Sequence, residues 1–401
     1  MALSAEQADS GDSRFHALDA TRACALLAGI VLHSITSFLP GFREANWPLS
    51  DNSTNAGLAV LFFVIHLFRM SLFFIIAGFF ARLLYKRYGM KDFIKNRLQR
   101  IGLPFVAFYL VIMPFTVIAI IWGARQLGIQ GPPKTVWPIP IIGPPVPWGH
   151  LWFLYLLLVI YTLALTIRAI VTRLDANNVM SEKIGELLNF FIRTRFAALI
   201  LTLPIAVSLF FSTWWQQWFG IPSPIVGLVP NLPALMAYGG AFLVGWFLHR
   251  HQESLSVLAK DWFLYFVAAL ISTITAIYIV GVTPKFEVIA LNKIEQALYA
   301  SAYIFAQWCW AFAIIGIAIK YFKKPDKQWR YLADASYWMY LIHLPIVWLL
   351  QAWMLSWPLH WSIKLPSMLL ITSFLLLASY HYLVRSTFMG KFLNGKKYPR
   401  I

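Results

Sequence analysis

The chain has 401 residues, of which 60% are hydrophobic and 12% are charged, and its mean hydropathy is +0.67. This balance excludes a soluble globular protein, which would need far more polar surface at this length, and indicates an all-α protein that crosses a membrane repeatedly. The net charge of +17 does not indicate nucleic-acid binding, because the basic residues fall in short connections between apolar segments.

Ten apolar segments, most of roughly twenty residues, are predicted to cross the membrane as helices. No Gly/Ser-rich linker or internal repeat divides them, so we expect one transmembrane domain over 17–385. An N-terminal tail at 1–16 and a basic tail at 386–401 flank it. In chain order, the predicted spans are 17–39, 57–81, 101–123, 149–171, 196–213, 232–249, 262–283, 298–320, 334–355 and 365–384.

The distribution of Lys and Arg predicts the orientation. If the N-terminus is cytoplasmic, the inner connections, such as 82–100 and 320–330, are rich in basic residues, whereas the outer connections hold few. By the positive-inside rule, both termini are expected in the cytoplasm. The N-terminal segment contains acidic residues and lacks the basic region of a cleavable signal peptide.

Two of the predicted outer connections are unusual. Segment 128–150 is crowded with Pro, which excludes a helix, and we expect it to form an ordered, extended cap. Segment 212–231 carries three Trp residues and no charge. It is either an aromatic belt at the membrane interface or a surface on which sugar rings stack, and the sequence favours neither.

The first predicted helix carries three ionisable residues on one face. Arg22 and His33 are eleven positions apart, which places them on the same side of a helix, about 16 Å apart along its axis. Asp19, Leu26 and Gly29 share this stripe, and Asp19 can pair with Arg22. Arg22 alone could extend to the inner interface. Together the three residues indicate a site within the membrane, with His33, Arg22 and Asp19 in catalytic roles.

Further polar residues in other segments suggest that this site is a shared cavity. Each of three pairs is separated by three positions, in the second segment, just before the third segment and in the ninth. The pair before the third segment suits a diphosphate, because two arginines on one face can make bidentate contacts. The candidate substrate-binding residues are His66, Arg69, Arg97, Arg100, Tyr340, His343 and, at the end of the tenth segment, Arg385.

The cysteine pattern predicts neither a disulfide framework nor a metal site. Cys24 and Cys309 both lie inside apolar segments, and no spacing typical of zinc ligands occurs.

The sequence motifs resemble those of membrane-bound acyltransferase family 3. The run LDATRACALLAGIVLH matches that family's LDxxRxxAxxxVxxxH, which contains Arg22 and His33. FRMSLFF, KNRLQRIGLPF, HLWFLYLL and SYWMYLIHLPI follow in the family's order, so the resemblance covers nearly the whole chain. Within the family, the chain is most similar to the branch that succinylates osmoregulated periplasmic glucans. Ser71 and Ala77 depart from that branch, where Pro and Ser are usual.

The resemblance implies an O-acyltransferase of the bacterial inner membrane. It would move an acyl group, succinyl or acetyl, from cytoplasmic acyl-CoA to a hydroxyl of a periplasmic or lipid-linked glycan. Acyl-CoA would be a co-substrate, no bound cofactor is expected, and glycan synthases are possible partners.

The resemblance also suggests roles for the candidate residues. Coenzyme A would dock where Arg22, Arg97, Arg100 and Arg385 gather. His33 would act either as a general base or as a transient acyl acceptor. Arg69, His66, Tyr340 and His343 would orient the thioester or stabilise the oxyanion.

Three other functions compete with glucan succinylation. The first is O-acetylation of a lipopolysaccharide or exopolysaccharide sugar. The second is a transporter of an anionic metabolite, although no short or Gly/Pro-broken helix pair recurs in the two halves of the chain. The third is a non-catalytic partner of a glycan synthase, which the paired Arg22 and His33 disfavour.

Overall fold

The computed structural model describes residues 2–130, 144–175, 177, 179–395 and 397–398, and within them the chain is helical. Short turns of 3-10 or π-helix occur at Thr36–Phe38, Leu98–Gly102, Gly149–Leu151, Gln217–Phe219 and Tyr380–Arg385. The α-helices are α1 Ala2–Ile35, α2 Ala56–Arg97, α3 Leu103–Leu127, α4 Trp152–Leu174, α5 Val179–Arg193, α6 Ala197–Phe210, α7 Leu232–Arg250, α8 Glu253–Val280, α9 Lys293–Tyr321, α10 Lys327–Met354, α11 Trp361–Ser379 and α12 Phe388–Asn394.

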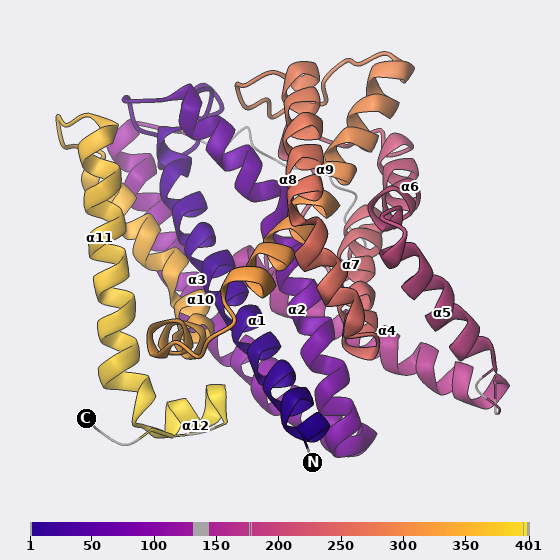
Figure 1. Ribbon diagram of the computed structural model, residues 1–401. Helices are drawn as coiled ribbons and strands as arrows, with labels where there is room; N and C mark the ends of the chain where they lie inside the picture. The colour runs from indigo at the N-terminus through magenta and orange to yellow at the C-terminus, as the bar shows by residue number, and fades with distance from the viewer. Residues whose placement is uncertain (1, 131–143, 176, 178, 396, 399–401) are drawn as a thin grey trace.

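This architecture confirms a polytopic membrane protein. Each of the ten predicted spans falls on a helix. Among the described residues, seven helical stretches are long and apolar enough to cross a membrane, and one of them, Ala56–Leu127, contains both α2 and α3. The first turns of α1 and the terminal helix α12 lie at the same end of the bundle (Figure 1). The count of ten and the cytoplasmic location of the termini stay predictions.

Helical structure extends into connections that the sequence analysis assigned to loops. Helix α2 continues through the basic connection to Arg97, interrupted at Gly89, where φ is +76°. Helix α5 occupies the predicted connection between the fourth and fifth spans and meets α6 at a bend of 108°. Several of its apolar side chains, including Leu187 and Phe190, are exposed, whereas Ile192 is buried. Charged and apolar faces on one short helix are typical of a helix lying in the membrane interface.

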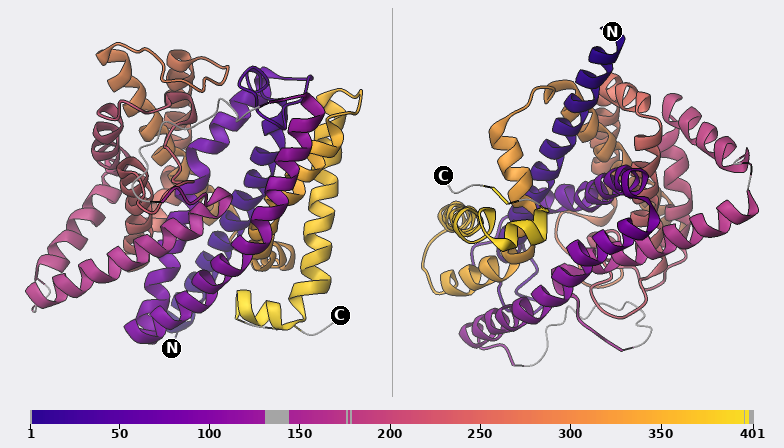
Figure 2. Two further views of the ribbon diagram at one scale, coloured as in Figure 1. Left: turned by 180° about the vertical axis from the view of Figure 1, so that it is seen from behind. Right: turned by 90° about the horizontal axis from the view of Figure 1, so that it is seen from below.

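Small residues allow the central helices to pack closely. A Cβ atom on Gly78 of α2 would lie 1.9 Å from the Phe242 carbonyl oxygen of α7, and one on Gly245 of α7 would lie 1.8 Å from the Ile75 oxygen. Such close backbone approach is common in membrane helix pairs. Helix α1 packs against α2, α9 and α10, whereas α4 and α5 extend away from the rest of the bundle (Figures 1 and 2). The polar stripe of α1 therefore faces other helices.

The predicted extended cap at 128–150 lies largely outside the described residues, which resume at residue 144. The described part is irregular up to Gly149 and pairs with the aromatic segment 212–231. The Trp148 backbone N–H donates to the Ile225 carbonyl at 2.7 Å, and the Gly227 N–H donates to Val146 at 3.0 Å. These two outer segments therefore support each other.

Segment 212–231 was interpreted as an interfacial aromatic belt or a sugar-stacking surface, and for two of its three Trp residues both interpretations are wrong. Trp215 and Trp218 are buried, with exposed fractions of 0% and 2%. Their indole N–H groups donate to the carbonyls of Gly220 at 2.6 Å and Gly281 at 3.2 Å. Because the loop folds inward over the helices, these two rings belong to the core and cannot form an interfacial belt or a sugar platform.

A buried ion pair fixes the end of the bundle opposite the two termini (Figure 1). Asp51, in the connection between α1 and α2, receives a hydrogen bond from the Lys364 ammonium of α11 at 2.5 Å. The side chains of Lys364 and Asp51 have exposed fractions of 2% and 4%. The pair therefore ties segments distant in the sequence.

Candidate active site

A cavity of about 730 Å³ runs beside α1 inside the bundle. Four members of the stripe predicted on the first helix line it, namely Arg22, Leu26, Gly29 and His33. The other walls come from α2 and the turn that follows it, the start of α4, α10, α12 and the connecting loops, and most of their side chains are apolar. Arg22 and His33, about 16 Å apart along the helix, thus open into the same space.

Most of the predicted site residues meet in this cavity. Asp19 lies outside the lining, with its carboxylate 3.4 Å from the Arg22 Nη2 atom. Arg385 also lies outside it, over the rings of Tyr331 and Tyr398 at 5.6 and 5.2 Å. Those that line the cavity are Arg22, His33, His66, Arg69, Arg97, Arg100, Tyr340 and His343.

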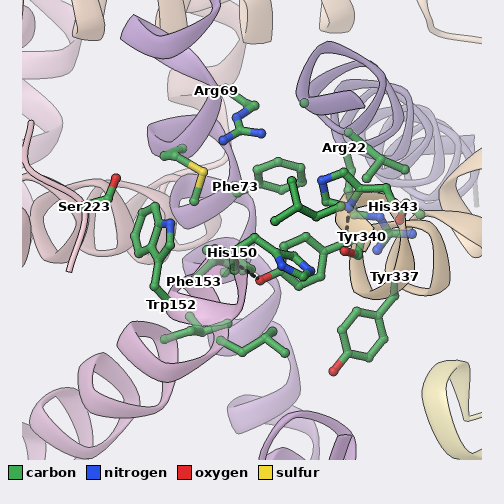
Figure 3. Close-up of a pocket in the computed structure, with 18 of the residues that line it drawn as sticks. Arg22, Arg69, Phe73, His150, Trp152, Phe153, Ser223, Tyr337, Tyr340 and His343 are labelled. Atoms are coloured by element: carbon green, nitrogen blue, oxygen red, sulfur yellow. Dashed lines mark hydrogen bonds between the residues drawn. The ribbon is translucent and has the colours of Figure 1, made fainter. Parts of the chain in front are cut away.

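Three histidines from three helical elements cluster in the cavity. The ring centroids of His33 and His343 are 5.3 Å apart, and so are those of His150 and His343. Figure 3 shows His150 and His343 beside Tyr340. The sequence analysis did not select His150, although this residue begins the HLWFLYLL motif. The Tyr340 hydroxyl donates to the His150 carbonyl at 2.8 Å, which fixes the start of α4 against α10.

Backbone carbonyls determine where His343 and His150 carry their protons. His343 Nδ1 is 2.7 Å from the Tyr340 carbonyl oxygen, and His150 Nε2 is 3.1 Å from that of Leu341. Because a carbonyl oxygen only accepts hydrogen bonds, each of these nitrogens must be the protonated one. The Nε2 atom of His343 is then a lone-pair acceptor, and it is buried without a partner among the described residues.

The His33 imidazole is held in place through its backbone and remains available for chemistry. The Gln351 side-chain N–H donates to the His33 carbonyl at 2.9 Å. Within the described part of the chain, the ring nitrogens of His33 make no hydrogen bond. A fixed imidazole that faces a cavity can take up or release a proton there. Gln351, which the sequence analysis did not select, therefore anchors the end of α1 that carries His33.

Arg69 enters the cavity from α2 beside Gly29. A Cβ atom on Gly29 would lie 2.6 Å from the Arg69 Nη1 atom, so the absence of a side chain makes room for the guanidinium. The Arg69 Nε atom is buried and has no hydrogen-bond partner in the described residues. His66, one turn earlier on α2, stacks on Phe62 with ring centroids 5.6 Å apart. Figure 3 shows Arg69, Tyr340 and His343 around the same space.

The end of the cavity near Arg22 is cationic. Arg22 donates to the Ala333 carbonyl at 2.7 Å, and the Tyr337 hydroxyl donates to the Arg100 carbonyl at 2.8 Å. Arg97 lies beside the Phe93 ring at 5.6 Å. Arg22, Arg97 and Arg100 therefore present three guanidinium groups to one end of the cavity, an arrangement that suits phosphate groups.

The short helix α12 borders this cationic end. Leu393 and Asn394 line the cavity, and the Asn394 side chain donates to the Asp334 carbonyl at 2.8 Å. The Tyr398 hydroxyl donates to the Asp334 carboxylate. The C-terminal segment is thus part of the cavity wall, a contribution that its sequence did not indicate.

The other end of the cavity is lined by Trp47 and Ser223, which lie in connecting loops, and by Trp348 of α10. Trp152 also lines the cavity but is 6% exposed, as expected of a packing residue (Figure 3). The cavity thus has a cationic end, a histidine cluster and an aromatic end. A cavity whose lining changes in this order from one end to the other suits a substrate with charged and uncharged parts.

The helical fold and this intramembrane site define a multi-pass membrane protein with an enzyme-like cavity. The family model of the acyltransferase 3 family, described as an acyltransferase domain, matches residues 15–380. The chain therefore belongs to that family and is a membrane acyltransferase.

Among curated proteins, the chain is similar to the glucans biosynthesis protein C of Escherichia coli K12. The two are 30% identical over 161 residues, which cover 38% of this chain and 39% of the relative. The protein of the same name from Shigella dysenteriae serotype 1 matches to the same extent. The similarity thus spans about two fifths of the length of these relatives. No solved structure matches the chain.

Proposed function

We propose that this acyltransferase moves an acyl group, succinyl in the first instance, from cytoplasmic acyl-CoA to a hydroxyl of a periplasmic glucan or another cell-envelope glycan. One observation carries the proposal: a single cavity joins the arginines at one end to the histidine cluster. The phosphates of coenzyme A would contact Arg22, Arg97 and Arg100, and the thioester would reach His33. The protein would be a bacterial inner-membrane enzyme with both termini in the cytoplasm.

In direct transfer, His33 acts as the general base. Its imidazole takes the proton of the acceptor hydroxyl while the hydroxyl oxygen attacks the thioester carbonyl. The carbon–sulfur bond breaks as the carbon–oxygen bond of the new ester is completed. The proton then passes from His33 to the coenzyme A thiolate, so the enzyme returns to its starting state.

In the alternative route, His33 attacks the thioester itself and forms an acyl-imidazole while the carbon–sulfur bond breaks and coenzyme A leaves as the thiol. The acceptor hydroxyl then attacks the acyl-imidazole, which gives the ester and restores the neutral His33 ring. His343 supports this route, since its unpartnered Nε2 atom lies on the ring next to His33 and can accept the proton that His33 loses. Incubation with labelled succinyl-CoA and no acceptor separates the routes. Label on a peptide containing His33 supports the acyl-imidazole, and an unlabelled protein that still transfers supports direct attack.

The name of the relatives, which refers to glucan biosynthesis, supports a glucan acceptor. O-acetylation of a lipopolysaccharide or exopolysaccharide sugar is the closest alternative. Mass spectrometry of envelope glycans from cells with and without the gene tests both. A mass difference of one succinyl group supports the proposal, whereas a difference of one acetyl group supports the alternative.

The alternative from another class is a transporter, in which the arginines of the cavity would bind an anionic metabolite during its passage across the membrane. Purified protein in liposomes would then exchange the anion across the bilayer without consuming acyl-CoA. Release of coenzyme A that depends on a glycan acceptor supports the enzyme. Anion exchange without coenzyme A release would overturn it.

A further inference from the structure

Arg69 differs from two other arginines of the cavity, Arg22 and Arg97, because its side chain has neither a hydrogen bond nor an ion pair among the described residues. Arg22 donates to a backbone carbonyl and lies near Asp19, and Arg97 pairs with the Asn96 side chain. The Arg69 Nε atom is buried and unpartnered. A buried cation is expensive unless an anion or several acceptors compensate it. The compensating group is therefore expected to come from outside the chain.

Among the described residues, no carboxylate pairs with Arg69. The titratable groups that interact with it electrostatically are the phenols of Tyr238 and Tyr340 and the imidazoles of the cavity. Among the described residues, Asp334 is the carboxylate on the cavity lining, and it receives the Tyr398 hydroxyl at the cationic end. Asp334 precedes His343 by nine positions on α10, about 13 Å along the helix axis.

The place of Arg69 relative to His33 fits a short acyl chain. Its Nη1 atom lies against Gly29, which is four positions, or about 6 Å along the axis, before His33 on the same helix. In a succinyl group, three carbon–carbon bonds of about 1.5 Å each separate the thioester carbonyl carbon from the carboxylate carbon. An acyl group lying between the two helices can therefore offer its carbonyl to His33 and its carboxylate to Arg69.

We infer that Arg69 is the specificity residue for the donor and binds the free carboxylate of an acyl group such as succinyl, in the space that Gly29 leaves beside it. The inference rests on the function proposed above. A carboxylate carries its charge before, during and after transfer, so it compensates the guanidinium throughout. A guanidinium also binds a carboxylate through two parallel hydrogen bonds, which makes the contact selective.

Two donors of equal chain length test the inference. Succinyl-CoA and butyryl-CoA both carry four-carbon acyl groups and differ in the terminal carboxylate. Full-length protein in lipid nanodiscs is assayed with each donor and with β-glucan oligosaccharides as acceptor. We expect wild type to favour succinyl-CoA. Arg69→Gln should lower kcat/KM for succinyl-CoA by at least roughly 30-fold and leave butyryl-CoA nearly unchanged. Arg69→Lys, which keeps the charge, should recover part of the preference.

The matched control is Arg82→Gln, the same substitution on the same helix but outside the cavity lining. It should keep the wild-type preference. Equal losses with both donors in Arg69→Gln would place Arg69 at the reacting carbonyl and overturn the inference. A wild type that uses both donors equally well would also overturn it.

Binding of two thioethers that cannot react separates this inference from the proposed function. S-(3-carboxypropyl)-CoA and S-butyl-CoA lack the carbonyl, so no oxyanion can form. Tighter binding of the carboxylated thioether by wild type, lost in Arg69→Gln, supports the inference even if no acyl transfer is detected and the proposed function fails. Equal affinity of wild type for both compounds overturns the inference even if transfer is observed.

Discussion

Two buried charged sites of this protein differ in what the chain itself supplies. At the end of the bundle opposite the termini, the Lys364 ammonium lies 2.5 Å from the Asp51 carboxylate, and both side chains are at least 96% buried. In the cavity, the Arg69 guanidinium has no ion-pair partner among the described residues. The chain thus supplies the opposite charge for Lys364, whereas for Arg69 we infer that a bound ligand supplies it.

The Asp51 site shows how a buried charge with an ion-pair partner stabilises the fold. Its second oxygen accepts the Ser53 N–H at 2.9 Å, and its own N–H donates to the Ser37 carbonyl at 2.8 Å. The carboxylate is therefore surrounded by donors from the loop and from α11. Removing one member of a buried pair typically destabilises a protein by about 3–5 kcal/mol, because the other charge is left without compensation.

The largest effect is expected where the cavity carries out the reaction. His33→Ala should lower the rate of acyl transfer by roughly 10²–10⁴-fold, the contribution of a general base, and more if an acyl-imidazole forms. The melting temperature in nanodiscs should change little, because the His33 ring makes no hydrogen bond in the described part of the chain. The transfer of labelled acyl groups in membranes gives the rate. A variant that transfers at the wild-type rate would remove His33 from the mechanism.

For the Lys364–Asp51 ion pair, we expect a loss of stability without a loss of activity. Lys364→Met should destabilise the folded protein by about 3–5 kcal/mol while the folded fraction keeps its turnover. Thermal or denaturant unfolding in nanodiscs measures the stability, and coenzyme A release per folded molecule measures the turnover. Lys293→Met, at an exposed position of α9, is the control and should be close to neutral.

A second substitution sharpens this result. Asp51→Asn combined with Lys364→Met removes both charges and should recover part of the lost stability. If the double variant is as unstable as the sum of the single variants, the ion pair is not the cause of the loss.

The sequence predicted the parts of the site that follow from helix periodicity. Arg22 and His33 could be placed on one face because a helix turns by a fixed angle per residue, and both line the cavity. The helical class followed from the lengths of the apolar segments. His150 and Gln351 were missed, because their roles depend on how the start of α4 packs against α10 and how α10 packs against α1, which no local pattern encodes.

The loops were the least predictable part of the fold. An uncharged, Trp-rich segment is typical of a membrane interface, yet Trp215 and Trp218 are core residues. Their burial is possible because the carbonyls of Gly220 and Gly281 accept hydrogen bonds from the indole N–H groups. Likewise, basic residues at 82–100 indicated a loop but sit largely on the continuation of α2. Charge reports the expected side of the membrane, not whether the backbone is helical there.

A smaller effect is expected at the cationic end of the cavity. Arg22→Gln should weaken the binding of acyl-CoA by roughly tenfold. The effect is limited because Arg22 is one of three guanidinium groups that share the contacts with the phosphates. Arg22 is half-buried, and its backbone contact to Ala333 at 2.7 Å is also lost, so stability should fall slightly. The dissociation constant of S-butyl-CoA measures the effect. Unchanged affinity would remove Arg22 from the donor site.

The smallest change tests the space beside Arg69 without altering any charge. In Gly29→Ala the new methyl group meets the Arg69 Nη1 atom at 2.6 Å, so the flexible end of the arginine must move away. We expect a fall of a few-fold in the preference for succinyl-CoA over butyryl-CoA, while stability stays equal or rises by up to about 1 kcal/mol from the better helix former. Gly239→Ala is the control, since nothing lies within 4 Å of its new methyl group. The same donor preference in both variants would mean that Gly29 does not position Arg69.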